Sequence, residues 1–100
     1  KYLPLTAQDV LSGILDGGLA PWIEDPARRT MFSTTIASSY IFGVADSANG
    51  TQWCAPAGLD AQGLMKPVLD ALNDLPKERQ SERASKVVIE ALGKAFPCTR

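Results

Sequence analysis

The sequence predicts an all-α fold, a small bundle of four or five helices. Apolar residues recur at helical spacing in four segments, and several of these segments follow a residue of a type that favours the N-cap position of a helix. No segment of useful length alternates between apolar and polar residues with the period of a strand. A chain of 100 residues suits one modest core, so we expect a single domain over residues 1–100.

The first helix is expected to begin after Thr6, with Asp9 placed to complete a capping box. Gly17 and Gly18 should end it. Asp25 followed by Pro26 is a strong start signal for a second helix over residues 26–47. Apolar residues cover more than one face of that second helix, so we expect it to be buried between the others as the central element. They are Met31, Phe32, Ile36, Tyr40, Ile41, Phe42, Val44 and Ala45.

Asp60 is expected to cap a third helix, which Pro67 should kink or divide. The last helix has the clearest period in the chain, with Ser81 as its expected cap. On its solvent face Glu82–Lys86 and Glu90–Lys94 are spaced to form ion pairs.

Composition excludes several classes of function. The formal net charge is −1, so nothing favours binding to nucleic acid or to an anionic membrane. No apolar run is long enough to span a bilayer. Histidine is absent, which removes Ser-His and Cys-His nucleophiles and leaves too few ligands for a zinc site. No catalytic residue, metal ligand or cofactor site is therefore predicted, and the protein is not expected to be an enzyme.

The two cysteines, Cys54 and Cys98, are too far apart in sequence for a C-x-x-C redox pair. The turn-forming residues around both favour a structural disulfide, which implies an oxidising compartment. The alternative is two separate buried thiols in a cytosolic protein. On the chain-entropy model a disulfide closing so long a loop stabilises a domain by about 4 kcal/mol.

Several short motifs occur in a fixed order between residues 25 and 98. They are Y-x-x-G-x-x-D at Tyr40, Gly43 and Asp46, W-C at Trp53-Cys54, P-x-x-R at Pro76 and Arg79, and A-L-x-x-A-F-P-C ending at Cys98. In this order the chain resembles the small periplasmic immunity proteins of type VI secretion systems, the Rap/Tai group. Residues 1–24 carry no motif of that group.

The resemblance implies a helical protein that is exported to the periplasm and inhibits a toxin there. Its partner would be a papain-like cysteine amidase that cleaves peptidoglycan, and family members are typically homodimers with a loop that enters the toxin's active-site groove. Cys54 and Cys98 would be the family's disulfide, and Gly43 and Asp46 its helix-end motif. Removal of a signal peptide, or trimming, would explain why the chain begins at Lys1.

The loop between the second and third helices is the expected contact surface, because a disulfide at its base would hold it rigid. The residues expected to bind the effector are Ser47, Asn49, Gly50, Thr51, Gln52 and Trp53. Trp53 has a competing interpretation as core cover beside the disulfide. Asp46 is expected to pair with Arg79. If the loop is not the contact surface, residues 16–26 are the next candidate.

A different class of function fits the same features. A central helix that is apolar all round, with a kink at Pro67, could open a cavity in a disulfide-stapled module. Such a module would bind a small apolar ligand or serve a structural role in an assembly.

Overall fold

A computed structural model describes residues 3–99 of the chain. It contains the helices α1 (Ala7–Leu15), α2 (Pro26–Ala48), α3 (Ala61–Asn73) and α4 (Ala84–Ala95), with a short 3₁₀ helix, η1 (Lys77–Arg79), before α4. Over these residues the only β-type pairings are two isolated bridges, so there is no strand. The all-α prediction is confirmed.

Three of the four helices begin where the sequence predicts, because each start is set by a local side chain. Thr6 and Asp9 form the reciprocal capping box of α1, with N···O distances of 3.1 and 2.9 Å. Asp25 accepts from the Arg28 N–H at 3.0 Å at the start of α2. Asp60 accepts from the Gly63 N–H at 2.8 Å at the start of α3.

The start of α4 differs from the prediction. Its N-cap position is Arg83, and no side chain caps it, so the assignment of Ser81 as cap is wrong. The Ala84 N–H instead donates to the Leu5 carbonyl at 2.9 Å, and the Ala7 N–H donates to the Glu82 carbonyl at 2.9 Å. The N-terminal segment thus supplies the acceptor that a capping side chain would otherwise provide.

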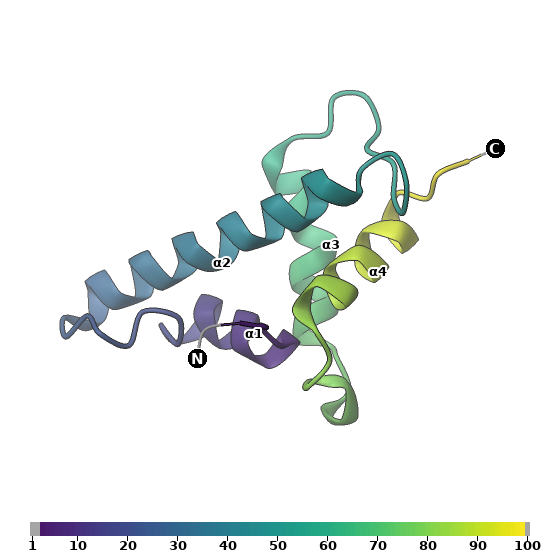
Figure 1. Cartoon of the computed structure of the whole chain (residues 1–100). Coiled ribbons are helices and arrows are strands. Elements are labelled where there is room, and N and C mark those ends of the chain that lie inside the picture. The colour runs from purple at the N-terminus through teal and green to yellow at the C-terminus, as the bar shows by residue number, and fades with distance from the viewer. Residues whose placement is uncertain (1–2, 100) are drawn as a thin grey trace.

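The second helix forms a long arm that α1 covers along one side (Figure 1). α4 packs on both α2 and α3, and α1 also touches α3 and α4. The molecule is elongated, with principal extents of 49 × 31 × 22 Å. Within the described part of the chain no helix is both long and apolar enough to cross a membrane.

The core lies where the C-terminal half of α2 meets α4 and α3. Its largest buried side chain is Trp53, which follows α2. The other large members come from all four helices: Val10, Ile41, Val68, Leu72, Val87, Val88 and Leu92. Burial of such side chains is the main stabilising term in a domain of this size.

The expectation that α2 is buried all round is wrong. Its buried residues are Ser33, Ala37, Ile41, Ala45 and Ala48. They form one narrow stripe, because α1 and α4 both pack on the same side of the helix. Met31 is 67% exposed and Phe32 is 53% exposed on the other side.

The third helix runs through Pro67 as one element, so Pro67 does not divide it. The apolar-cavity alternative rested on a central helix that is apolar and buried all round and on a kink at Pro67. The exposed outer side of α2 removes the first of these two features.

Candidate functional site

The predicted contact loop is a tight turn at the end of α2, which we call the braced loop (residues 49–54). Cys54 at its end is joined to Cys98 by a disulfide with a Cα–Cα distance of 4.8 Å. The Cys54 N–H also donates to the Phe96 carbonyl at 3.0 Å. The predicted disulfide is confirmed, and it ties the braced loop to the segment that follows α4 (Figure 1).

Hydrogen bonds within the braced loop fix its shape. The carbonyl of Ala48 accepts from the Thr51 N–H at 3.1 Å, from the Gln52 N–H at 3.0 Å and from the Thr51 hydroxyl at 2.9 Å. The Gly50 N–H donates to the Trp53 carbonyl at 2.7 Å. Since the N–H groups of residues 50–52 are all used internally, the loop is ordered before any partner arrives.

Gly50 is required by its backbone conformation rather than by crowding. Its φ is +91°, and a Cβ built at this position would meet no atom within 4 Å. A side chain would therefore have room but would strain the backbone, because only glycine adopts positive φ readily. This geometry explains why the turn directly after α2 carries Asn-Gly.

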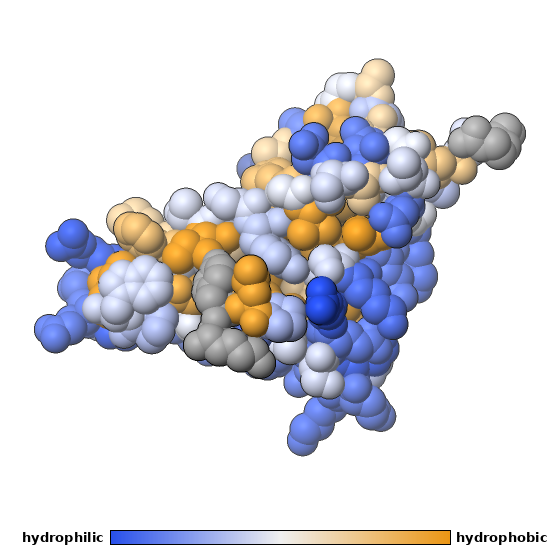
Figure 2. Space-filling model, viewed as in Figure 1, coloured by the Kyte–Doolittle hydropathy of each residue, from blue (hydrophilic) through white to orange (hydrophobic). Residues whose placement is uncertain are grey.

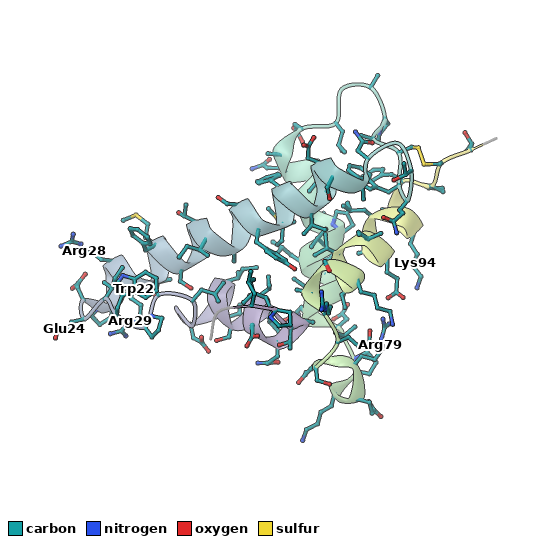
Figure 3. The ribbon with its side chains drawn as sticks, viewed as in Figure 1. Trp22, Glu24, Arg28, Arg29, Arg79 and Lys94 are labelled. Atoms are coloured by element: carbon teal, nitrogen blue, oxygen red, sulfur yellow. A yellow bond between two sulfur atoms is a disulfide. The ribbon has the colours of Figure 1, made fainter. Side chains whose placement is uncertain are left out.

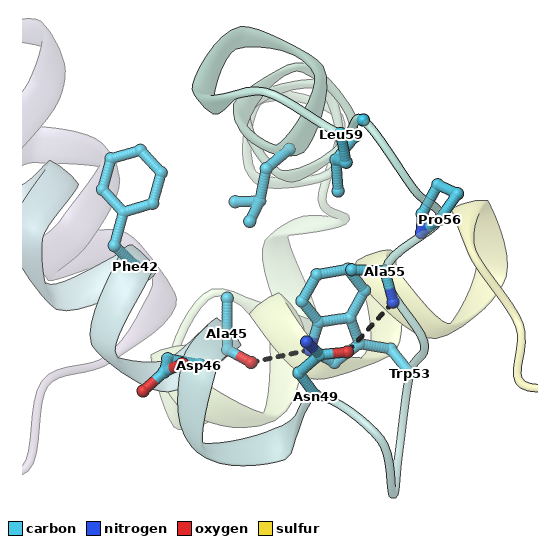
Figure 4. Close-up of a pocket in the computed structure, with 10 residues that line it drawn as sticks. Phe42, Ala45, Asp46, Asn49, Trp53, Ala55, Pro56 and Leu59 are labelled. Atoms are coloured by element: carbon cyan, nitrogen blue, oxygen red, sulfur yellow. Dashed lines mark hydrogen bonds between the residues drawn. The ribbon is translucent and has the colours of Figure 1, made fainter.

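Trp53 points into the protein and not toward solvent. Its side chain is 2% exposed, and its Nε1–H donates to the Ala45 carbonyl at 2.8 Å (Figure 4). Its ring centroid lies 6.0 Å from that of Phe96. The structure therefore places Trp53 in the core, as the competing interpretation held. There it packs under the braced loop, between the end of α2 and Phe96.

The other predicted contact residues are all exposed, but they do not form one group. Gly50, Thr51 and Gln52 lie together at the tip of the braced loop. The amide oxygen of Asn49 accepts a hydrogen bond from the Ala55 N–H at 3.0 Å (Figure 4), which links the start of the braced loop to the residue that follows it. Ser47 lies on the last turn of α2, where its hydroxyl donates to the Val44 carbonyl at 2.8 Å.

A groove of about 520 Å³ begins beside Gln52 and runs over the solvent face of α4. Its other lining residues are Glu82, Arg83, Ser85, Lys86, Ile89 and Glu90. The braced loop approaches α4 closely at Gly93, where an added Cβ would lie 3.2 Å from the Gln52 carbonyl oxygen. The sequence predicted only that this face of α4 is exposed to solvent. Gly93, inside an otherwise regular helix, was the one local sign that another part of the chain approaches it.

Arg79 organises the charges at the far end of this groove. Its guanidinium donates to the Glu82 carboxylate at 2.8 and 3.1 Å and to Glu90 Oε1 at 2.8 Å. These hydrogen bonds raise the pKa of Arg79, and the bond donated to Glu82 has the largest effect. The same bond is the main cause of the lowered pKa of Glu82. The predicted Asp46–Arg79 pair is therefore wrong, because Arg79 is engaged by α4.

Of the two ion pairs predicted along α4, Glu82–Lys86 forms, whereas Glu90 pairs with Arg79 in place of Lys94. Lys86 Nζ lies 3.8 Å from Glu82 Oε1, as the spacing indicated. Glu90 is bound by Arg79 from the η1 turn. Among residues 3–99 no three His, Cys, Asp or Glu side chains gather in a way that could hold a metal ion.

One comparison with known proteins bears on this site. The family model described as Rap1a immunity proteins matches residues 9–98, which include the braced loop, the disulfide and all of α2, α3 and α4. No curated protein matches the chain at a significant level.

Proposed function

Because the chain belongs to the Rap1a immunity protein family, we propose that it binds and occludes a toxic effector, and that this effector is a type VI secreted peptidoglycan amidase. The family match over residues 9–98 is the observation that carries the proposal. The amidase target comes from the motif resemblance and is the narrower part of the hypothesis. Inhibition by occlusion requires no catalytic group, so we propose a role as an inhibitor and not as an enzyme.

The tip of the braced loop is the proposed point of entry into the effector. A turn that is already hydrogen-bonded and tethered by a disulfide loses little conformational freedom on binding, which favours affinity. Within the described chain, the backbone N–H groups of the tip are used internally, whereas the Gly50 and Thr51 carbonyls accept no backbone hydrogen bond. Together with the Gln52 side chain, they can accept hydrogen bonds from a polar cleft.

The groove along α4 is the proposed second part of the contact. It opens beside Gln52 and carries both signs of charge, since Arg83 and Lys86 line it together with Glu82 and Glu90. A rim of mixed charge sets orientation and partner choice more than affinity. An effector that admits the loop tip would therefore be oriented by its contact with α4.

The proposed location is the periplasm, with the protein acting as a homodimer. The disulfide supports an oxidising compartment, since such bonds persist there and are rare in the cytosol. In that compartment the protein would meet an amidase delivered by neighbouring cells before the cell wall is cleaved.

The first prediction tests inhibition and the loop together. Purified protein should abolish peptidoglycan cleavage by its cognate amidase at a one-to-one ratio. Gln52→Arg at the loop tip should weaken binding at least tenfold, which corresponds to about 1.4 kcal/mol, while leaving the melting temperature unchanged. Binding is measured by calorimetry, and cleavage by release of peptide-stem fragments.

Gln62→Arg is the matched control, because Gln62 is also an exposed glutamine and lies on α3. It should bind like the parent protein. If cleavage proceeds undiminished with the parent protein in excess, the proposed function is wrong. If inhibition holds but Gln52→Arg binds normally, the contact surface lies elsewhere, and residues 16–26 become the next candidate.

A further inference from the structure

A second groove, of about 380 Å³, lies between the end of α2 and the start of α3, and we call it the α2–α3 groove (Figure 4). Phe42 of α2 and Leu59 of the following turn stand on opposite sides of it, and Trp53 and Asn49 of the braced loop also line it. Gln52 of the same loop lines the groove along α4 instead. The braced loop therefore adjoins both grooves.

The turn that forms the wall opposite α2 is held in shape by the chain itself. The Leu59 N–H donates to the Pro56 carbonyl at 3.2 Å, and Gly58 between them has a φ of +81°, which only glycine adopts readily. The Leu59 side chain lies against the backbone of α3, because a Cβ added at Gly63 would be 2.9 Å from its Cδ1 atom. The α2–α3 groove is thus formed before a partner arrives.

Asp46 is the one charged residue among those that line the α2–α3 groove. It lies one helical turn after Phe42, so the carboxylate and the aromatic ring share one face of α2. Within residues 3–99 Asp46 takes part in no salt bridge, since Arg79 is engaged by α4. Figure 3 shows Arg28 and Arg29 at the opposite end of α2, where Arg28 is about 27 Å away along the helix axis.

A partner that covers this groove would remove water from the Asp46 carboxylate. Burial of an unpaired charge is costly, so the covering group has to supply a cation as well as apolar surface. Figure 2 shows the same mixture over the lobe formed by the end of α2 and the turn that follows, where hydrophobic and hydrophilic residues alternate on the surface. A long cationic side chain with an apolar stem has this composition.

Arginine suits the groove better than lysine. Its guanidinium is planar, is more weakly hydrated than an ammonium group, stacks on aromatic faces and donates two parallel hydrogen bonds to a carboxylate. We propose that the α2–α3 groove receives an arginine side chain of the effector, with the guanidinium on Asp46 and Phe42 and the stem against Leu59. This inference rests on the proposed function, because it names a second contact with the same effector.

Gly43 is consistent with a partner that approaches at this point. It lies inside α2 between Phe42 and Asp46, and an added Cβ would meet no atom within 4 Å. Glycine weakens a helix interior, and neither crowding nor positive φ within the chain explains it here. The bare backbone leaves room beside the groove for the main chain that carries the arginine.

The first test removes the charge of Asp46 without changing its size. Asp46→Asn should weaken binding to the cognate amidase by roughly tenfold or more, measured by calorimetry, and should make the remaining binding less sensitive to salt. The melting temperature should stay the same. Asp74→Asn is the matched control, because Asp74 is also exposed and without a salt bridge within residues 3–99 but lies outside the α2–α3 groove.

The second test concerns the aromatic wall. Phe42→Leu keeps an apolar side chain but removes the ring face on which a guanidinium stacks, so it should also weaken binding to the amidase. Phe32→Leu makes the same change at an exposed phenylalanine of α2 that does not line the groove, and it should bind like the parent protein.

The partner residue is identified with amidase variants in which each surface arginine is replaced by glutamine in turn. One variant should bind the parent protein roughly tenfold more weakly, yet bind Asp46→Asn no more weakly than the unchanged amidase does. If the parent protein inhibits the amidase but Asp46→Asn binds normally, or if no arginine is coupled to Asp46, this inference is wrong and the proposed function stands. Coupling to an amidase lysine, or an effect of Asp46→Asn on sedimentation mass alone, would assign the groove to another occupant and overturn the inference. A parent protein that does not bind the amidase would overturn both.

Discussion

At the scale of single residues, Ser33 is the buried polar group on which the α1–α2 contact depends. Its side chain is fully buried; its hydroxyl donates to the Gly13 carbonyl at 2.6 Å and accepts from the Leu19 N–H at 2.9 Å. Gly13 must be small here, because an added Cβ would lie 2.5 Å from the Leu19 side chain. One hydroxyl therefore holds the end of α1 and the following turn against the arm of α2.

Ser33→Ala should destabilise the protein by about 1–3 kcal/mol, because the buried Leu19 N–H would lose its acceptor. Urea unfolding followed by circular dichroism measures this change. Ser47→Ala serves as the control: that hydroxyl is exposed, and its loss should change stability by less than about 0.5 kcal/mol. Equal small effects in both variants would show that water replaces the Ser33 hydroxyl.

At the scale of elements, the η1 turn is fastened to α4 by charge. Arg79 reaches Glu82 at the approach to α4 and Glu90 two turns along it. Both pairs are only partly buried, so each is screened by water and salt. Because the Arg79 guanidinium binds both carboxylates, Glu82 and Glu90 must be ionised for η1 to be held against α4 by these pairs.

This dependence predicts an acid limb in the stability profile. The pKa of Glu82 is lowered in the folded state from its ordinary 4.5, chiefly by the Arg79 hydrogen bond. The unfolded chain therefore binds the proton first, and stability due to this pair is full above pH 4.5 and falls as pH drops through the lower folded value. Arg79→Met should flatten that limb between neutral and acid pH, as measured by the urea midpoint.

Lys66→Met provides the comparison, because Lys66 pairs with Asp70 at 3.2 Å on an exposed face. Its profile should follow that of the parent protein. A parent profile with the same acid limb as Arg79→Met would mean that the η1 charges contribute no pH dependence.

At the scale of the whole molecule, the disulfide ties the turn after α2 to the end of α4. The two half-cystines are separated by 44 positions in sequence, and the segment between them contains α3, η1 and α4.

Cys54→Ser should lower the free energy of unfolding by about 4 kcal/mol under oxidising conditions. Under reducing conditions the variant and the parent protein should unfold alike, since neither then has the cross-link. Thermal unfolding with and without a reductant measures both. A variant as stable as the oxidised parent would show that the packing of Trp53 and Phe96, not the cross-link, holds the segment.

What the sequence alone determined is the set of features encoded locally or by pairwise chemistry. Three helix starts follow from Thr6, Asp25 and Asp60, whose side chains cap neighbours three residues away. The cysteine pairing and the family motifs were also readable, because only two cysteines were present and the motifs occur in a fixed order.

Only the tertiary structure decided which groups meet across the fold. Leu5 took the place of Ser81 at the start of α4, Arg79 bound α4 rather than Asp46, and Trp53 turned inward. The outer face of α2 stayed open because both neighbouring helices pack on one side. The periodicity of apolar residues shows which faces of a helix are apolar. Only the packing of the other helices decides which of those faces is buried.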